Sequence, residues 1–468
     1  MLTVASIQFI VALLVTALLY SLAAKGIKPW FLLLASLAFY GSFNWYFLFL
    51  LIGVIGITYS AGLAIHRYRK ARGQVLLWTA AVLSPLLFYK YLIVWFPGLW
   101  ESIIPVSGFD LEGYGKVLIP VGLSFFTFQC LGYVFDIHRG YYEPERHPAR
   151  FSLFVAFFPQ LLAGPIERWP NLSRQLTEAG RPSPEMVLDG LQLLAYGFFM
   201  KHILADWLAF YVDAAFVDPA ANSSAASFIG LYGFPIQLYA DFCGYSLIAL
   251  GSARLFGVKL TMNFRQPFFA RSIEEFWQRW HISLTRWVGD YLYRPLALRM
   301  IRYKGLSKGV QEGCVLFVTW VVIGMWHGAL WTFFVFGLCM ALLFVIHSMG
   351  KRRRRGRPPL WRSALAMLVT FHLIVLTFPL IRAGTIGDYL DLVTSAFAFL
   401  PGHIPFTGAF LNVVFSLAVV VCVDMVRRLY PDFRFRGLYT RIALVGIMIV
   451  LVMVMGHDEG KTIIYFGF

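Results

Sequence analysis

Apolar stretches of about 20 residues recur along the chain, separated by short polar segments. A helix of that length crosses the hydrocarbon core of a bilayer. We therefore predict an all-α, polytopic integral membrane protein with about 11 transmembrane helices. The predicted spans are Leu2–Leu22, Trp30–Phe43, Tyr46–Ile65, Val75–Phe96, Val117–Ile137, Leu188–Val212, Ser227–Leu250, Val315–Ile346, Leu360–Ile381, Phe410–Val426 and Ile442–Met455. Two shorter stretches, Phe151–Ile166 and Tyr389–Leu400, are predicted to be re-entrant or interfacial helices.

Composition supports this class. Hydrophobic residues make up 59% of the chain and charged residues 14%, whereas soluble domains carry about a quarter charged residues. The first apolar run follows Met1 without basic residues and has the length of a span, so we expect no cleavable signal peptide. The five cysteines lie in apolar segments and are predicted to be small buried residues, not a disulfide or metal framework.

The placement of the net charge of +16 predicts the topology. Loops rich in lysine and arginine stay on the cytoplasmic side, and placing every basic cluster there leaves both termini on the opposite, outer side of the membrane. For Lys351–Arg357, topology and contact with anionic lipids are the favoured explanation, and recruitment of a phosphate-bearing cytosolic cofactor is a compatible alternative. Nucleic-acid binding has no support beyond the charge. The basic clusters are Lys25/Lys28, Arg67–Arg72, Arg299–Lys308, Lys351–Arg357 and Arg427–Arg441.

The segment Ser272–Met300 has the pattern of an amphipathic helix. Ser272 and Glu275 have the spacing of a capping box at its start. Aromatic and apolar residues then recur every three or four positions, a pattern typical of a helix lying at the membrane interface. An interfacial anchor explains these residues but not His281, which lies close to the apolar face. The periodic residues are Phe276, Trp280, Leu284, Trp287 and Tyr291.

His327 is the second histidine of interest, because it lies within the apolar run Val315–Ile346. A titratable side chain at membrane depth is costly and normally faces a protein interior or a water-filled cavity. Gly324 and Gly328 allow close approach of backbone or ligand. The residues alone leave two interpretations open: a buried histidine bonded to a neighbouring helix, or a group that transfers protons.

Several strings in this order and spacing resemble the membrane-bound O-acyltransferase (MBOAT) family, most closely its bacterial branch that O-acetylates exported polysaccharides. The resemblance covers about Gly122 to His327 and both ends of the chain, and implies a single transmembrane domain over 1–468 with its motifs at about 117–347. The strings are Gly122–Gln129, Tyr133–Asp136, Phe158–Pro165, Gln237–Ser246, Asn263–Pro267, Arg279–Leu284, Asp290–Tyr293, Met325–Gly328 and Ile464–Phe468.

This resemblance implies that His327 is the catalytic histidine and that His281 is a second functional position. A neutral histidine in an apolar site can take the proton of an acceptor hydroxyl; whether His327 acts as this base or carries the acyl group itself stays open. For the buried polar candidates, hydrogen bonds between helices are the favoured interpretation. The candidate substrate or tunnel residues are Trp326, Gln129, Asp241, Tyr245, Trp280 and Asp290.

The resemblance also implies acetyl-CoA as donor, no metal, and a periplasmic partner that passes acetyl to the polymer. We expect a Gram-negative inner-membrane enzyme with a central funnel that meets at His327. It would serve an exopolysaccharide of alginate or cellulose type, beside a synthesis and export complex. The alternative is acyl or D-alanyl transfer to another cell-envelope polymer. A proton-coupled transporter is remote, because the sequence shows no internal repeats and no obvious acid–base pairs within the spans.

Overall fold

The computed structural model describes residues 6–68, 73–96, 120–162, 164–178, 180–303, 305–349, 359–399, 407–429 and 438–456. Every regular element in these ranges is helical, which confirms the predicted all-α class. In chain order the elements are α1 Ile7–Leu22, α2 Lys28–Phe43, α3 Trp45–Arg67, α4 Gly73–Leu87, η1 Phe88–Leu92, α5 Ile93–Trp95, α7 Leu123–Arg139, α8 Pro148–Ala156, α9 Phe158–Leu161, α10 Trp169–Glu178, α11 Pro184–Phe199, η2 Met200–Ala205, α12 Asp206–Ala215, η3 Pro219–Ala221, α13 Ser224–Leu255, η4 Pro267–Phe269, α14 Ile273–Arg279, α15 Ile282–Val288, η5 Gly289–Tyr293, α16 Arg294–Met300, α17 Lys308–His327, α18 Trp331–Met349, α19 Leu360–Thr377, η6 Phe378–Ile381, α20 Ile386–Phe397, α21 Thr407–Leu429 and α22 Leu438–Met455.

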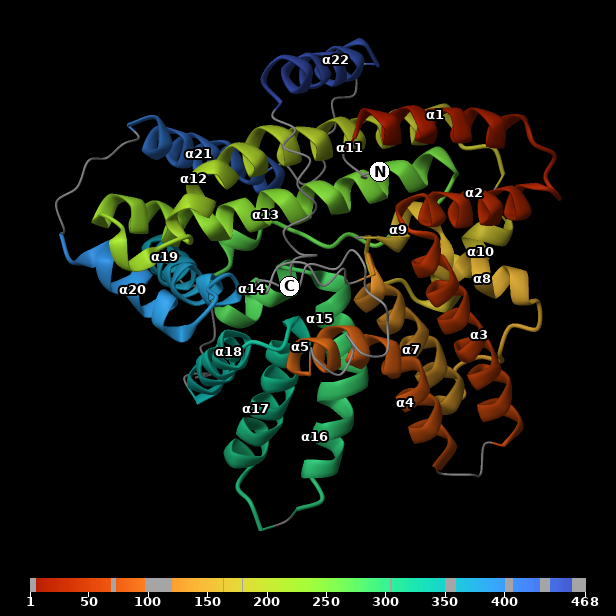
Figure 1. Cartoon of the computed structure of the whole chain (residues 1–468), viewed down its shortest axis with the longest axis horizontal. Helices are drawn as coiled ribbons and strands as arrows, with labels where there is room; N and C mark the ends of the chain where they lie inside the picture. Colours follow the sequence, from red (N-terminus) through yellow and green to blue (C-terminus); the bar gives the residue numbers. More distant parts are fainter. Residues whose placement is uncertain are drawn as a thin grey trace. The chain divides into compact units, whose positions relative to one another are not determined.

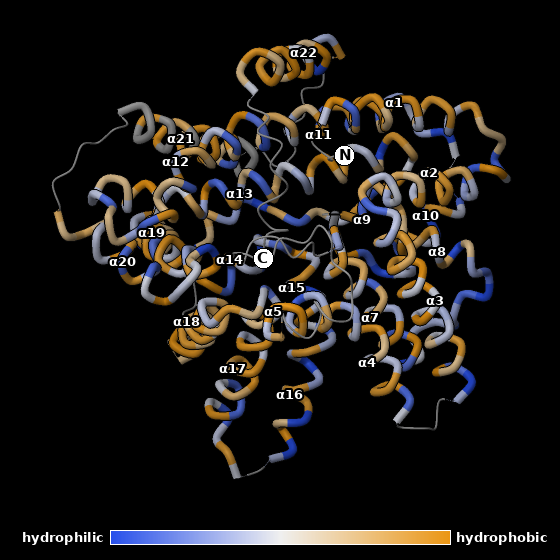
Figure 2. The backbone as a smooth tube through the Cα atoms, viewed as in Figure 1, coloured by the Kyte–Doolittle hydropathy of each residue, from blue (hydrophilic) through white to orange (hydrophobic). Residues whose placement is uncertain are grey.

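Seven helical stretches of the described chain are long and apolar enough to cross a membrane. Figure 2, which colours the backbone by hydropathy, shows many hydrophobic positions along these stretches. A multi-pass membrane protein is therefore confirmed, whereas the predicted number of about 11 spans is not. The seven stretches are Trp45–Arg67, Gly73–Trp95, Pro184–Ala215, Lys308–His327, Trp331–Met349, Leu360–Ile381 and Leu438–Met455.

The chain divides into two compact units, each described by itself. The first comprises residues 6–198 with 245–262, and the second comprises residues 199–244 with 263–456. The prediction of a single domain over 1–468 stays a prediction.

In the first unit, α3, α4 and α7 pack together, and α2 packs against α3 and α8. The close contact between α3 and α7 needs Gly62, because a Cβ built there would lie 2.8 Å from Cε1 of Tyr133. Gly122 begins α7 with φ of +78°, a conformation that glycine adopts readily. The motif that begins with this glycine is thus the start of a buried helix.

In the second unit, α17 and α18 form an antiparallel pair, which corrects one prediction. The run Val315–Ile346, expected as one span, is two helices joined by the short turn Gly328–Leu330. The rings of Trp320 and Phe344 lie 4.9 Å apart, and Gly313 approaches Val345, so contacts run in opposite directions along the two helices. The ends at Lys308 and Met349 therefore lie at the same end of the pair.

Helix α16 also packs against α17, and Figure 1 shows the two side by side with their connection at one end. Arg299, Arg302 and Lys308 are exposed at this tip, which is hydrophilic in Figure 2. A helix of the length of α17, 20 residues, extends about 30 Å. The basic tip and His327 thus lie about 30 Å apart along α17.

Other predictions meet the structure differently. Cys130 and Cys243 are buried as expected, but Cys339 is only half-buried, and Cys314 and Cys422 are exposed. All five cysteines are free thiols. The polar segments Glu101–Glu112 and Lys351–Arg357 and the terminal motif Ile464–Phe468 lie outside the described residues.

Candidate functional site

The predicted continuous helix over Ser272–Met300 is interrupted at His281. Trp280 ends α14, and His281 has φ of 44° and ψ of 52°, the left-handed conformation that non-glycine residues rarely adopt. Asn263 holds the chain directly after it: its backbone carbonyl accepts from the amide of Ile282 at 2.9 Å, and its side-chain Oδ1 accepts from the amide of Ser283 at 3.2 Å. A strained backbone conformation fixed by neighbouring groups is common at functional sites.

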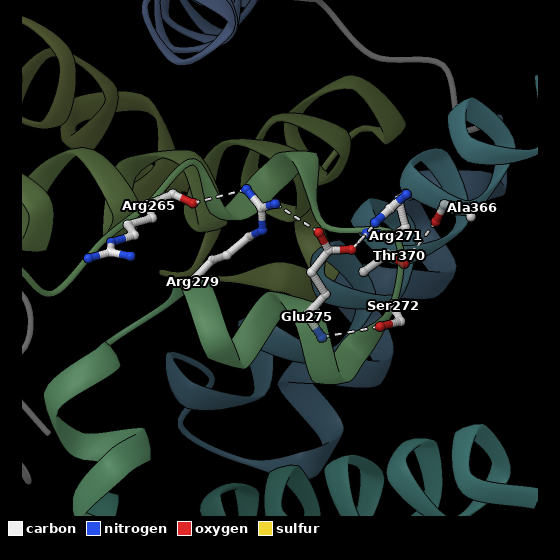
Figure 3. A network of polar contacts seen from close by, with 7 residues as sticks. All are labelled: Arg265, Arg271, Ser272, Glu275, Arg279, Ala366 and Thr370. Carbon is white, nitrogen blue, oxygen red and sulfur yellow. Dashed lines mark hydrogen bonds and ion pairs between the residues drawn. The ribbon is translucent and has the colours of Figure 1, made fainter. Parts of the chain in front are cut away.

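The start of α14 confirms the predicted N-cap. The amide of Glu275 donates to the hydroxyl of Ser272 at 3.1 Å. The Glu275 carboxylate does not return to the amide of Ser272, as a full capping box requires; it accepts from the backbone amide of Arg271 at 2.8 Å and from Nη2 of Arg279 at 2.8 Å. Figure 3 shows this arrangement, in which Arg279 also reaches the carbonyl of Arg265. The network ties α14 to the loop that precedes it.

The aromatic residues of this segment are packed inside the second unit, which corrects the prediction of an interfacial aromatic face. Phe276 stacks on Trp280 with ring centroids 5.4 Å apart, and Leu284 and Trp287 are buried as well. The predicted periodicity of Ser272–Met300 is present in the structure, because the residues at this spacing from Phe276 to Trp287 are buried. Its apolar side meets other helices of the second unit, since Phe276 contacts Phe378 and Trp277 contacts Trp320.

The imidazole of His281 lies in an aromatic surrounding and is 1% exposed. Its ring meets Phe242 edge to face with centroids 4.8 Å apart. Phe242 contacts Phe264, and Phe264 contacts Trp280, both at 5.1 Å. Burial lowers the pKa of His281 to about 3, so the imidazole is neutral at physiological pH.

His327 is the last residue of α17 and is 7% exposed. Gly328 ends the helix, and a Cβ built on it would lie 2.5 Å from the ring of Phe333, so this position requires a glycine. The imidazole is 4.8 Å from the ring of Trp326, 5.8 Å from Phe336 and 6.1 Å from Phe333, measured between ring centroids. These rings exclude bulk water and strengthen electrostatic interactions at the histidine.

Phe378, in the short helix η6, connects the surroundings of the two histidines. Its ring lies 5.2 Å from Trp280, the residue before His281, and 6.1 Å from Phe336, which contacts His327. The sequence patterns indicated neither Phe378 nor Phe336, because a buried aromatic residue in an apolar run has no local signal of its own. His281 and His327 thus border one aromatic cluster.

Gln129 and Tyr245 are predicted site residues that belong to the first unit. Gln129 donates from Nε2 to the carbonyl of Phe154 at 2.7 Å and accepts from Nε2 of Gln160 at 2.6 Å. These bonds match the favoured interpretation of hydrogen bonds between buried segments. Tyr245 is buried in α13.

Asp241 and Asp290, two further candidates, are ion-paired. Asp290 meets Arg294 at 2.8 Å on an exposed surface. Asp241 lies 2.8 Å from Nζ of Lys201, a residue of the candidate span Pro184–Ala215. The expectation of no acid–base pairs within the spans is therefore wrong. The two residues are 40 positions apart in sequence, so no local pattern could show their contact.

Comparisons with known proteins agree with the motifs. The model of a family described as MBOAT, membrane-bound O-acyltransferase, matches residues 121–381. Over 390 residues the chain is 32% identical to a Pseudomonas aeruginosa protein described as probable alginate O-acetylase AlgI, covering 81% of this chain and 72% of that protein. A peptidoglycan O-acetyltransferase of Helicobacter pylori is 29% identical over 398 residues, 78% of this chain and 73% of that protein. A teichoic acid D-alanyltransferase of Streptococcus thermophilus is 27% identical over 305 residues, 59% of this chain and 71% of that protein.

Proposed function

Because the chain belongs to the membrane-bound O-acyltransferase family, we propose that it transfers acetyl groups from cytoplasmic acetyl-CoA to an acceptor on the periplasmic side. The acetyl groups serve the O-acetylation of an exopolysaccharide of alginate or cellulose type. The observation that carries this proposal is His327, buried at the end of α17 and surrounded by aromatic rings.

In the proposed reaction, His327 is the general base. The acceptor hydroxyl oxygen bonds to the acetyl carbonyl carbon while the imidazole takes the hydroxyl proton. The carbon–sulfur bond then breaks, and the proton passes from the imidazole to the departing thiolate. Atoms and charge balance without a metal ion or a further reactant.

His281 has a supporting role in this proposal. Its neutral imidazole lies beside Trp280 in the aromatic cluster that His327 also borders. We assign it to orienting the substrate or to a direct part in proton transfer. Trp326 and Trp280 supply rigid apolar walls for the acetyl group.

The donor is proposed to approach from the tip of the α16–α17 hairpin. Arg299, Arg302 and Lys308 are exposed there and suit the phosphates of coenzyme A. Basic loops favour the cytoplasmic side, and from the sequence alone we propose the same side for the cluster Lys351–Arg357. In the proposed topology both chain termini lie in the periplasm, and we propose a Gram-negative inner membrane as the location of the protein. Cysteine labelling that places both basic segments outside the cell would overturn the donor route.

The acceptor is proposed to be a hydroxyl on a periplasmic partner protein, which then acetylates the polymer beside the synthesis and export complex. Two similar proteins are named for O-acetyl transfer, to alginate and to peptidoglycan. D-alanyl transfer to an envelope polymer is the second candidate. Its support is weaker, because the D-alanyltransferase relative matches 59% of this chain, against 81% for the alginate relative.

Reconstitution in liposomes tests the proposal. The purified protein is supplied with acetyl-CoA outside and polymer inside, with and without the candidate partner in the lumen. We expect thioester-dependent acetylation of the polymer that requires the partner. Efficient polymer acetylation without a partner would make the enzyme a direct polysaccharide acetyltransferase, and D-alanyl transfer without acetyl transfer would favour the second candidate.

A further inference from the structure

The turn between helices α1 and α2, both in the first unit, carries a lysine whose side chain is buried. The two helices run antiparallel, because the ring of Phe9 near the start of α1 lies 5.7 Å from the ring of Phe39 near the end of α2. Figure 1 shows them side by side with their connection at one end. Lys28, the first residue of α2, is 5% exposed, whereas Lys25 in the same turn is exposed.

The ammonium group of Lys28 lies over the ring of Tyr20, with Nζ 4.5 Å from the ring centroid. Among the residues that the structure describes, no carboxylate forms an ion pair with Lys28. Attraction to the face of an aromatic ring offsets only part of the free energy that burial of an ammonium group costs. The charge of Lys28 therefore calls for an anion.

The hydroxyl of Tyr20 is the second group that lacks a partner. Tyr20 is 0% exposed, and its ring meets the edge of Phe256 with centroids 5.3 Å apart. Within the described part of the chain, the hydroxyl has no hydrogen-bond partner. A buried polar group without a partner is unfavourable and is rare in native structures. This hydroxyl can donate to the same anion that neutralises Lys28, because the ammonium group lies over its ring.

The start of α2 adds a third positive feature. A helix N-terminus carries a partial positive charge, so a lysine there is unfavourable unless an anion lies close by. The N-cap residue, Ile27, supplies no side-chain hydrogen bond to the first turn. Helix N-termini bind phosphate groups readily, and here the helix end coincides with the buried lysine and the hydroxyl.

The surface around this turn is apolar. Leu22, Ile27 and Trp30 are 69%, 59% and 59% exposed. Exposed tryptophan beside basic residues is typical of the level of the lipid headgroups. A basic turn also favours the cytoplasmic side, where the leaflet is rich in anionic lipids. These surroundings favour an anion that carries acyl chains over a soluble one.

We propose that Lys28 and Tyr20 form a binding site for the phosphate group of an anionic phospholipid. The ammonium group and the hydroxyl donate to phosphate oxygens, and the acyl chains lie along the exposed apolar residues of α1, such as Val15 and Leu18. The site is independent of acyl transfer, because Lys28 and Tyr20 belong to the first unit and both histidines of the candidate active site belong to the second.

Native mass spectrometry of the full-length protein in detergent, titrated with phosphatidylglycerol, tests the site. For Lys28→Met we expect the affinity for the first bound lipid to fall about tenfold, because a charge-assisted hydrogen bond is lost. Tyr20→Phe keeps the ring and removes the hydroxyl, and should lower the affinity about threefold. Lys25→Met is the matched control, because it removes the same charge from an exposed position and should change the affinity less than about twofold.

Equal losses in Lys25→Met and Lys28→Met would overturn the proposal, because binding would then depend on net charge alone. Equal affinity for phosphatidylcholine would overturn the preference for an anionic lipid. Displacement of the lipid by glycerol 3-phosphate at equal concentration would assign the site to a soluble phosphate. If Lys28→Met does not fold, Tyr20→Phe decides, and an unchanged affinity would refute the site. The readout needs neither acetyl-CoA nor an acceptor, so it is separate from the test of the proposed function.

Discussion

Gly324 of α17 lies directly against Gly337 of α18. A Cβ built on Gly324 would lie 2.9 Å from the Cα of Gly337, and one built on Gly337 would lie 2.6 Å from the carbonyl oxygen of Trp320. The backbones of the two helices touch here because neither residue has a side chain. This contact fixes the last turn of α17, which ends at His327. The prediction that Gly324 permits close approach is confirmed.

Gly337→Val should separate these helices and displace His327. Overpacking of a tight contact costs about 1–3 kcal/mol and often more, so we expect lower thermal stability in detergent and loss of transfer activity. Gly309→Ala is the control, because a Cβ there meets nothing within 4 Å. Equal stability of the two variants would contradict the packing described.

Asn263 should be a positioning residue for His281. Asn263→Leu removes the acceptor for the amide of Ser283, so the turn that holds His281 loses one bond, and we expect kcat to fall more than KM changes. Asn263→Asp keeps an acceptor oxygen at the same place and should retain part of the activity. A loss of kcat that is equal in both variants would show that the bond to Ser283 is not what matters.

The buried His281 should make stability depend on pH. The unfolded chain takes up a proton on this residue below about pH 6.5, whereas the folded protein keeps it neutral down to about pH 3. The stabilising contribution is therefore complete above pH 6.5 and is lost as the pH falls, by about 1.4 kcal/mol per unit. Unfolding in mixed micelles from pH 7 to pH 5 should show a steeper loss for the unmodified protein than for His281→Asn, a residue that tolerates the left-handed conformation. Parallel slopes would refute this.

Removing Lys201 should lower the stability of the protein, because its ammonium group contacts the carboxylates of Asp206 and Asp241, which are both buried. For Lys201→Met we expect a loss of about 3–5 kcal/mol in the free energy of unfolding. Combining it with Asp241→Asn should recover part of that loss. Arg294→Met breaks the exposed pair with Asp290 and should cost less than about 1 kcal/mol. A similar cost for Lys201→Met and Arg294→Met would show that the contacts of Lys201 with Asp206 and Asp241 are not desolvated.

Apolar run length predicted the class of protein and the positions of most helices, since the bilayer imposes that length directly. It failed at Val315–Ile346, because the turn at Gly328–Leu330 is itself apolar and hydropathy continues through it. The prediction from helical periodicity failed at His281, because the periodic pattern continues through a residue with a left-handed backbone conformation. Periodicity describes which side of a segment is apolar and does not show where hydrogen bonds from a distant residue, such as Asn263, interrupt the helix.

The candidate site was partly predictable for the same reason. His327 stands out because it is an ionisable residue within an apolar run, and His281 because it lies within a recognisable motif. Phe378 does not, since its role arises from contacts with residues far away in sequence. Lys201 is an ionisable residue in a predicted span, but its pairing with Asp241 cannot be read from the sequence.

The rate of acetyl transfer by the variant His327→Ala tests most directly the central claim, that His327 is the general base. The purified variant and the unmodified protein are reconstituted in liposomes with acetyl-CoA and the acceptor, with His372→Ala, a half-buried histidine of α19 outside the proposed site, as control. Thermal unfolding of each sample establishes that it is folded. Because His327 is assigned as the base, we predict that His327→Ala loses acetyl transfer to background while His372→Ala keeps it. Near-normal transfer by folded His327→Ala would contradict the account.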